Sequence, residues 1–226
     1  MEPARIKVCI FDVNGVLIDS NAANAQAMAQ AFTEDPELQS RIVDAYLQLT
    51  GIDRGSKMRI VQDRVVGRPF TENEFELRWE GFKRLGRISM LRAPLTTGCR
   101  EVLAELGRMK ITRVALSNTP LEELREALAN RGLNILLDEI RGGGDWPKSE
   151  TLARFLRDCR IEPRHCLFLG DGKGDLDAAR RNGVPFAAID PGTGEFRGET
   201  GFDGPYPNIA EWLRSVLNRL PQNKLA

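Results

Sequence analysis

The hydrophobic positions of this chain form two kinds of pattern. Beyond residue 98, short apolar runs alternate with longer stretches in which an apolar residue recurs at every third or fourth position. Short continuous runs are typical of buried strands, and the wider spacing is typical of amphipathic helices. The predicted strands are 6–11, 111–116, 136–140, 165–169 and 184–189; the predicted helices are 98–109, 120–131, 148–159, 175–182 and 209–220; and 191–207, rich in glycine and proline, is predicted to be a loop. This alternation favours an α/β fold, a parallel sheet with helices on both faces.

The segment 21–94 has a different pattern, because it contains no strand-like run. Apolar residues at helical spacing predict helices over 22–32, 36–49, 55–66 and 71–85. We therefore expect an all-helical domain at 21–94, inserted into an α/β domain made of residues 1–20 and 95–226. The chain is expected to cross between the two domains near 19–21 and 93–98, where turn-forming residues gather.

Composition and charge exclude several classes of function. The chain of 226 residues has 32 lysines and arginines against 32 aspartates and glutamates. This balance argues against a partner that is a nucleic acid or an anionic membrane surface. No apolar stretch reaches the length of a signal-peptide core or a membrane span, so we expect a cytoplasmic protein. We expect it to be a monomer or a homodimer.

Cysteine and histidine usage narrows the chemistry further. The four cysteines are Cys9, Cys99, Cys159 and Cys166, and none forms a C-x-x-C pair. We expect reduced thiols in the core rather than disulfides or metal ligands. His165 is the only histidine and stands at the entry to a predicted strand, so a Ser-His-Asp triad is not supported.

Polar residues follow three predicted strands at the point where each one ends: Asp12 after the first, Ser117 and Asn118 after 111–116, and Asp171 and Asp175 after 165–169. The carboxyl ends of parallel strands meet at one edge of a sheet, where α/β folds place their ligands. Asp12 is therefore a candidate nucleophile or metal ligand. Each of these residues also has a structural alternative, because Asp can cap a helix and Ser-Asn can form a simple turn.

Four segments, in this order, resemble the motifs of the haloacid dehalogenase-like superfamily. They are Phe-Asp-Val-Asn-Gly-Val-Leu-Ile-Asp-Ser from Phe11 to Ser20, Ser117 with its neighbours, Lys148, and Gly-Asp-Gly-Lys-Gly-Asp from Gly170 to Asp175. One such motif alone is a weak signal, whereas all of them in order are a strong one. The resemblance covers roughly 6–190 and implies a Rossmann-like parallel sheet flanked by helices, with 21–94 as a helical cap.

The resemblance also implies an activity and the residues that perform it. It implies a Mg²⁺-dependent phosphatase acting on a small organic phosphate, for which a sugar phosphate is one candidate. Asp12 is expected to attack phosphorus and to form an aspartyl-phosphate. Ser117 and Asn118 are expected to bind the phosphate, and Lys148 is expected to pair with both Asp12 and the phosphate. The alternative is that Lys148 lies on the solvent-exposed face of a helix and has no role in a site.

A metal site is implied by the same motifs. Mg²⁺ prefers oxygen ligands in near-octahedral geometry and often uses only one or two carboxylates. The expected ligands are Asp12, the backbone carbonyl of Asn14, and Asp171, with Asp175 close by or hydrogen-bonded to them. This cofactor is expected because of the family resemblance.

Asn14 departs from the phosphatase motif, since the resembled enzymes carry a second Asp there. That Asp protonates the leaving alcohol and then deprotonates the attacking water, which is typically worth ~10²–10⁴-fold in rate. An amide does neither at neutral pH, so we expect intact phosphate and metal binding with impaired turnover. Several explanations stay open: a changed residue in an ordinary phosphatase, a substrate with a good leaving group such as an acyl phosphate, a non-catalytic relative, or deamidation of Asn14-Gly15 to Asp.

The polar segment 50–57 lies between two predicted cap helices and resembles the substrate-facing loop of capped relatives. Arg54 and Lys57 are expected to contact an anionic or hydroxylated substrate when the cap closes. For Lys57, a surface charge near a helix N-terminus is an equal alternative.

The function that these residues favour is phosphoryl hydrolysis of a small phosphate ester, impaired by Asn14. The alternative from another class is a catalytically weak or inactive relative that binds a phosphorylated metabolite. Turnover separates the two, because both require the same phosphate and metal site.

Overall fold

A six-stranded parallel sheet forms the centre of the protein. The computed structural model describes residues 6–49, 53–143 and 146–219. The strands are β1 (Val8–Phe11), β2 (Thr112–Pro120), β3 (Glu139–Gly143), β4 (Cys166–Gly170), β5 (Phe186–Ile189) and β6 (Asp203–Tyr206), in the order β3-β2-β1-β4-β5-β6. Every neighbouring pair is parallel, which confirms the predicted α/β fold. Because β1 lies between β2 and β4, the three ends that carry polar residues are adjacent.

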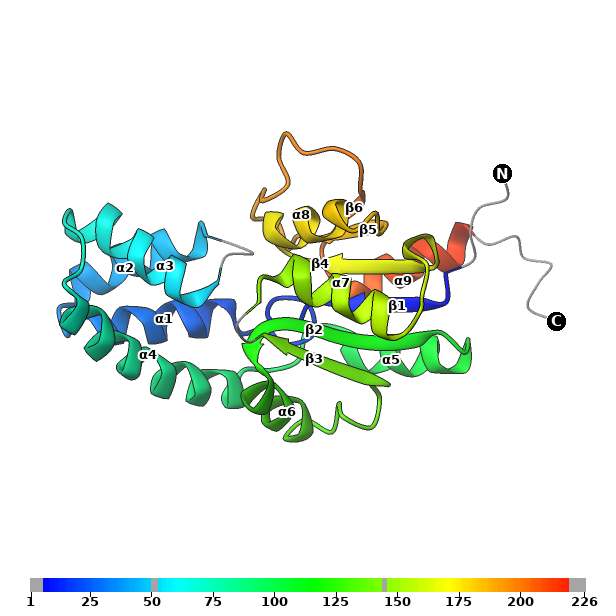
Figure 1. The fold of residues 1–226 in the computed structure, drawn as a ribbon, viewed down its shortest axis with the longest axis horizontal. Coiled ribbons are helices and arrows are strands. Elements are labelled where there is room, and N and C mark those ends of the chain that lie inside the picture. Colours follow the sequence, from blue (N-terminus) through cyan, green and yellow to red (C-terminus); the bar gives the residue numbers. More distant parts are fainter. Residues whose placement is uncertain (1–5, 50–52, 144–145, 220–226) are drawn as a thin grey trace.

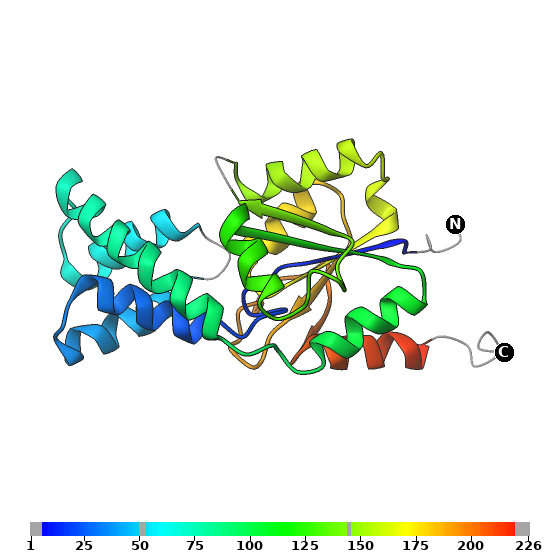
Figure 2. The ribbon, with the colours of Figure 1, turned by 90° about the horizontal axis from the view of Figure 1, so that it is seen from below.

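Helices cover both faces of the sheet. They are α5 (Cys99–Arg108), α6 (Leu121–Ala129), α7 (Lys148–Asp158), α8 (Lys173–Arg181) and α9 (Ile209–Arg219). Figure 2 shows α5 and α9 on one side of the sheet and α7 on the other. Phe11 packs in a cluster with α5, α6 and α9, whereas Ile10 packs with α7 and α8. Since consecutive strand residues point to opposite faces and both faces are buried, β1 reads as a continuous apolar run.

A second group of helices lies beyond the carboxyl end of the sheet, as Figure 1 shows. These are α1 (Asn21–Phe32), α2 (Pro36–Leu47), α3 (Arg54–Val61), which continues into a π-helical turn (Gln62–Val66), and α4 (Glu72–Arg92). They share a hydrophobic cluster of their own, with Met28, Ile42, Met58 and Phe82 fully buried. The division into two domains at 21–94 stays a prediction.

Side-chain caps explain where three of these helices begin. Asp35 accepts a hydrogen bond from the backbone N–H of Glu37 at the start of α2. Thr71 and Glu74 form a reciprocal capping box at the start of α4. Asp53 accepts from the backbone N–H of Ser56 and so fixes the first turn of α3. This last cap matters for the site, because α3 carries two of the expected substrate-binding residues.

Differences from the sequence predictions include β6, β3 and α4. Strand β6 lies within the expected loop at 191–207, because an edge strand with a proline and few buried side chains shows no apolar alternation. Strand β3 begins at Glu139 rather than 136, since the apolar residues before it pack into the core from a turn. Helix α4 extends to Arg92 instead of ending at 85, through the buried Gly86.

The cysteines and the histidine lie away from the carboxyl end of the sheet or in its core, with one exposed thiol. All four cysteines are free; Cys9, Cys99 and Cys166 are buried. Cys159 is exposed, so the expectation of a core thiol is wrong there, because this residue caps the carboxyl end of α7 at the surface. His165 ends a short 3-10 turn at the amino end of β4, the opposite end of that strand from Asp171.

Among the described residues, two ion pairs join the second group of helices to α6. Arg54 places Nη1 3.0 and 3.2 Å from the two carboxylate oxygens of Glu123, and these side chains are only 13% and 14% exposed. Arg87 of α4 pairs with Glu126 at 2.8 Å, but its side chain is 59% exposed and that of Glu126 is 41% exposed. Exposed ion pairs contribute little to the stability of the fold because water screens the two charges. Screening weakens as a pair becomes buried.

We expect Arg54→Ala and Glu123→Ala to be coupled by about 1 kcal/mol in the free energy of unfolding, since the pair is largely shielded from water. A double-mutant cycle measured by urea denaturation tests this. The matched control is the Arg87–Glu126 cycle, for which the coupling should stay below about 0.5 kcal/mol. Equal coupling in the two cycles would show that burial of the first pair adds nothing.

Candidate active site

Three carboxylates meet at the carboxyl edge of the sheet. Asp12 follows β1, Asp171 follows β4, and Asp175 lies in the first turn of α8. Each contributes one oxygen to a cluster in which these atoms all lie within 4.8 Å of one another. Asp12 and Asp175 are buried, and Asp171 is partly buried. The order of the strands, rather than nearness in sequence, therefore brings these acids together.

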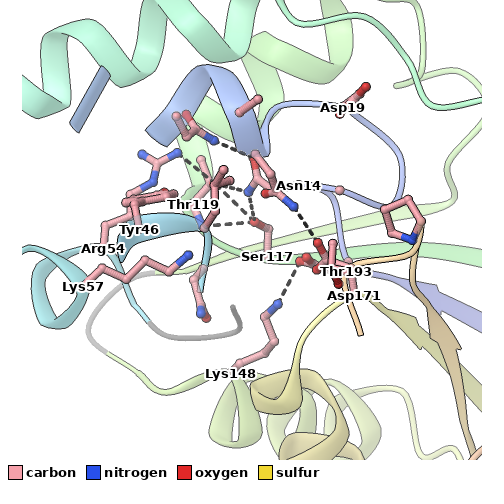
Figure 3. A pocket seen from close by; sticks show the side chains of 18 residues that line it. Asn14, Asp19, Tyr46, Arg54, Lys57, Ser117, Thr119, Lys148, Asp171 and Thr193 are labelled. Atoms are coloured by element: carbon pink, nitrogen blue, oxygen red, sulfur yellow. Dashed lines mark hydrogen bonds and ion pairs between the residues drawn. The ribbon is translucent and has the colours of Figure 1, made fainter. Parts of the chain in front are cut away.

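Lys148 is the cation at the centre of this cluster. It is the first residue of α7, and its Nζ lies 2.8 Å from Oδ1 of Asp12 and 2.5 Å from Oδ1 of Asp175. The side chain is only 7% exposed, which excludes the alternative of a solvated helix face. Figure 3 shows it reaching from below into the same space as Asp171. Lys148 thus ties α7 to the ends of β1 and α8.

The charges at this site are unbalanced. Burial raises the pKa of Asp12 to about 6, although the nearby ammonium of Lys148 opposes the rise. Burial, and then the charges of Asp12 and Asp175, raise the pKa of Asp171 well above its usual range. Burial lowers the pKa of Lys148, but the two carboxylates outweigh it and the net shift is upward. Three acids with one directly paired cation leave an excess of negative charge.

The donor set fits a divalent cation of the Mg²⁺ type. It is made of carboxylate oxygens, the ligand chemistry that hard cations prefer, and it contains no thiol or imidazole. A positive ion among Asp12, Asp171 and Asp175 would relieve the repulsion that raises the pKa of Asp171. Asn14 lines the same cavity as Asp12 and Asp171.

Gly15 and Asn21 fix the position of Asp171, and sequence reasoning missed Asn21. Gly15 has φ +83°, and a Cβ at this position would lie 2.0 Å from Oδ2 of Asp171. Only glycine therefore allows the chain to pass this close to the carboxylate. Asn21, at the start of α1, donates its side-chain N–H to that same oxygen over 2.7 Å. No motif marks Asn21, because its partner lies far away in the sequence.

The side-chain amide of Asn14 is engaged on both sides. Its Oδ1 accepts hydrogen bonds from Ser20 at 2.6 Å and from Asn24 at 3.4 Å. Its Nδ2 donates to Thr119 at 3.2 Å and to Ser117 at 3.5 Å. The amide consequently links the end of β1 to α1 and to the end of β2. Ser20, Asn24 and Thr119 were not anticipated from the sequence.

The end of β2 lies further along the chain than predicted. The strand runs to Pro120 instead of ending at 116, so Ser117 and Asn118 lie within it and not at a strand-to-helix junction. The Ser117 hydroxyl is buried and accepts from the backbone N–H of Thr119 at 3.1 Å. Ser117, Asn118 and Thr119 all line the cavity, so the structure does bring this segment to Asp12.

Arg54 and Lys57 both belong to α3, and both line the cavity. The expected substrate-facing loop at 50–57 is only partly covered, because 50–52 lie outside the described residues. Arg54 is the first helical residue rather than a loop residue, and it is paired with Glu123. Lys57 is partly buried, with Nζ 4.4 Å from the ring centre of Tyr46. Figure 3 shows Lys57 extended toward the side of the cavity where Ser117 and Lys148 lie.

These side chains enclose a cavity of about 300 Å³ between the edge of the sheet and α1–α3. The loop after β5 completes its wall with Pro191 and Thr193. Asp190 holds this loop, since its carboxylate accepts hydrogen bonds from the backbone N–H groups of Gly192, Thr193 and Gly194. The cavity thus has an acidic floor and carries Arg54 and Lys57 on its opposite wall.

In the described part of the chain, no helix combines the length and the apolar character needed to cross a membrane.

Comparison with known proteins gives relatives over most of the chain. An N-acetylmuramic acid 6-phosphate phosphatase of Pseudomonas putida is 25% identical over 219 residues, covering 94% of this chain and 92% of the relative. A phosphoglycolate phosphatase of Haemophilus influenzae is 26% identical over 201 residues, covering 82% and 86%. The crystal structure of a predicted phosphoglycolate phosphatase from Haemophilus somnus superposes with a TM-score of 0.74 at 18% identity, covering 93% of this chain and 98% of the other.

The sequence profile of the haloacid dehalogenase-like hydrolases matches residues 6–183. This range contains β1 to β4, the second group of helices and all the carboxylates of the cluster. The expectation of a hydrolase with this fold is therefore confirmed. The chain belongs to the haloacid dehalogenase-like hydrolase family.

Proposed function

We propose that this protein is a Mg²⁺-dependent phosphatase that hydrolyses a small organic phosphate through an aspartyl-phosphate on Asp12. The observation that carries the proposal is the buried Asp12 carboxylate, held 2.8 Å from Lys148 beside Asp171 on the floor of the cavity. The names of the sequence relatives, which are phosphatases of N-acetylmuramic acid 6-phosphate and of phosphoglycolate, support this substrate class. A sugar phosphate fits it as well.

Asp12 is the proposed nucleophile. Lys148 favours the ionised form of its carboxylate, which the attack on phosphorus requires. The buried hydroxyl of Ser117 and the amide of Asn118 would bind phosphate oxygens, and Lys148 would stabilise the charge that develops on them. The placement of these groups at the ends of β1 and β2 and the start of α7 would hold the phosphoryl group in line with Asp12.

Asp12, the backbone carbonyl of Asn14, and Asp171 would hold the Mg²⁺, with Asp175 beside them. When bound, the ion would neutralise phosphate charge so that the anionic nucleophile can approach. Asn21 would keep the Asp171 carboxylate in its orientation through the 2.7 Å hydrogen bond. Asp175 would act chiefly by holding Lys148.

Asn14 would lower the turnover of this site. Its Nδ2 donates to two hydroxyl oxygens and its Oδ1 accepts from two donors, and an amide exchanges no proton at neutral pH. The proposed phosphate and metal ligands do not include this side chain, so binding would persist. A relative that binds a phosphorylated metabolite with little or no hydrolysis is therefore the second candidate, favoured by this observation alone.

Substrate selection would come from the helices above the sheet, which we propose as a cap domain at 21–94. Arg54 and Lys57 present positive charge to the cavity from α3. They would bind an anionic or hydroxylated part of the substrate remote from the phosphate. Cytoplasmic location and a monomeric or homodimeric state stay predictions.

The first test is Mg²⁺-dependent phosphate release from 4-nitrophenyl phosphate. We expect release by the wild-type protein and none by Asp12→Asn, because an amide is not a nucleophile toward phosphorus. Asp177→Asn is the matched control, since Asp177 is an exposed acid that pairs with Arg181 on α8. Circular dichroism should show the same fold in all three proteins. Full activity of Asp12→Asn would remove Asp12 as the nucleophile, and inertness of wild type would favour the binding protein.

Asn14→Asp should raise the rate of phosphate release by about 100-fold or more, the size of effect expected when an acid–base group is supplied. A carboxylate fits this position, because Ser20 and Asn24 already donate to it and the hydroxyls of Ser117 and Thr119 can turn to donate. The measurement is steady-state hydrolysis of the same ester. Equal rates in the two proteins would show that turnover is not limited at residue 14.

Asp171→Asn should weaken Mg²⁺ binding by at least about tenfold, because one anionic oxygen ligand is lost. Isothermal titration with MgCl₂ measures this without any substrate, so the result does not depend on turnover. Asp177→Asn again serves as the control and should bind Mg²⁺ like the wild type. Unchanged affinity in Asp171→Asn would place the metal elsewhere.

A further inference from the structure

Hydrolysis of a phosphate ester needs a proton donor, and Asn14 does not supply one. The leaving oxygen must gain a proton when its bond to phosphorus breaks, unless the leaving group is already a stable anion. Both ends of the Asn14 side chain are hydrogen-bonded to neighbouring side chains, so its amide is already engaged within the protein. If this family member turns over ordinary esters, another group has to exchange the proton.

The cavity wall carries few alternatives. Lys148 is bound between two carboxylates, and Arg54 is paired with Glu123. Burial raises the pKa of Tyr46 to about 12, which makes its hydroxyl a poor proton donor and a poor source of phenolate. Asp19 is exposed, and Figure 3 shows its carboxylate pointing away from Ser117 and Lys148. Asp12 and Asp171 are the proposed nucleophile and metal ligand, so among the titratable groups of the described cavity wall Lys57 is the one that these assignments and contacts leave uncommitted.

The position of Lys57 and its lowered pKa both suit proton exchange. Its side chain extends into the cavity with Nζ over the Tyr46 ring, and no carboxylate of the described residues forms an ion pair with it. Burial lowers the pKa of Lys57 to about 8; the carboxylates of Asp171 and Asp12 oppose this, while Arg54 and Lys148 add to it. An acid whose pKa is near the working pH gives up and regains its proton readily.

We propose that Lys57 is the catalytic acid and base of this enzyme, exchanging the proton that Asn14 does not, but from the opposite wall of the cavity and so less effectively than an aspartate at position 14 would. The inference rests on the proposed phosphatase function and deepens it. A role in binding a remote anionic group of the substrate is the competing account of Lys57, and the tests below separate the two.

The proposed reaction has two chemical steps, and Lys57 gives up a proton in the first and regains it in the second. In the first, a carboxylate oxygen of Asp12 forms a bond to phosphorus, the bond from phosphorus to the ester oxygen breaks, and Lys57 passes a proton to that oxygen, leaving alcohol, aspartyl-phosphate and a neutral amine. In the second, water attacks phosphorus, the amine of Lys57 takes one of its protons, and the bond from phosphorus to Asp12 breaks. Inorganic phosphate leaves, and the Asp12 carboxylate and Lys57 ammonium are restored.

The test compares kcat/KM for phenyl phosphate and 4-nitrophenyl phosphate, which have similar shapes but different leaving groups. Phenolate is a strong base, with a conjugate-acid pKa of about 10 as in Tyr, whereas 4-nitrophenolate leaves with little help. We expect Lys57→Gln to lose about 100-fold or more on phenyl phosphate and less than about tenfold on the nitro ester. The ratio kcat/KM reports the first phosphoryl transfer, so slow hydrolysis of the aspartyl-phosphate does not mask the effect.

Three further variants sharpen the result. Lys57→Arg keeps the positive charge but does not release a proton, so it should lose as much on phenyl phosphate as Lys57→Gln does. In the Asn14→Asp background the added carboxylate exchanges the proton, so Lys57→Gln should no longer discriminate between the two esters. Lys83→Gln, on an exposed α4 residue that pairs with Glu80, controls for loss of a lysine elsewhere among these helices.

Each outcome decides between the accounts. Equal losses on the two esters in both backgrounds, or rescue by Lys57→Arg, would overturn the inference and assign Lys57 to substrate binding, while the phosphatase function would stand. If neither the wild type nor Asn14→Asp releases phosphate from either ester, the proposed function itself fails.

Discussion

The site depends on one buried ammonium held between two carboxylates. Lys148 sits 2.8 Å from Asp12 and 2.5 Å from Asp175, and these three residues come from the end of β1, the start of α7 and the first turn of α8. Removing Lys148 from this cluster would leave two buried carboxylates without a compensating cation, which is strongly destabilising. The same contact that fixes α7 and α8 against the sheet therefore favours the ionised form of Asp12, the proposed nucleophile, at the edge of the cavity. Structure and chemistry at this edge of the sheet cannot be varied independently.

The second constraint is the excess of negative charge that remains after this pairing. Asp171 contributes the third carboxylate, and it is held in place by the glycine backbone at Gly15 and by the amide of Asn21. Because Asn21 begins α1, the orientation of this carboxylate depends on how that helix leaves the sheet. Arg54 and Lys57 face the same space from α3. Acids on the floor and cations opposite suit the proposed kind of ligand, which has a phosphate at one end and polar groups at the other.

Much of the fold could be predicted from the sequence, because buried parallel strands and amphipathic helices leave clear apolar patterns. The strand ends also revealed Asp12, Ser117 and Asp171, since topology alone gathers such residues at one edge. The edge strand β6 left no such pattern. Nor could the sequence show Ser20, Asn24 and Thr119 around Asn14, or the pairing of Arg54 with Glu123, because these contacts join segments whose approach is decided only by tertiary packing.

The backbone around Asn14 and Gly15 has a consequence for the chemical ageing of the protein. Deamidation of an Asn-Gly pair begins when the glycine nitrogen attacks the side-chain carbonyl of the asparagine. In the folded chain the N–H of Gly15 is donated to the carbonyl of Ile18 at 2.7 Å, and the Asn14 side-chain oxygen is held by Ser20. Neither atom is free to swing into the geometry of attack. Aspartate at this position would therefore accumulate in chains that have spent time unfolded, and its presence in a sample would record that history.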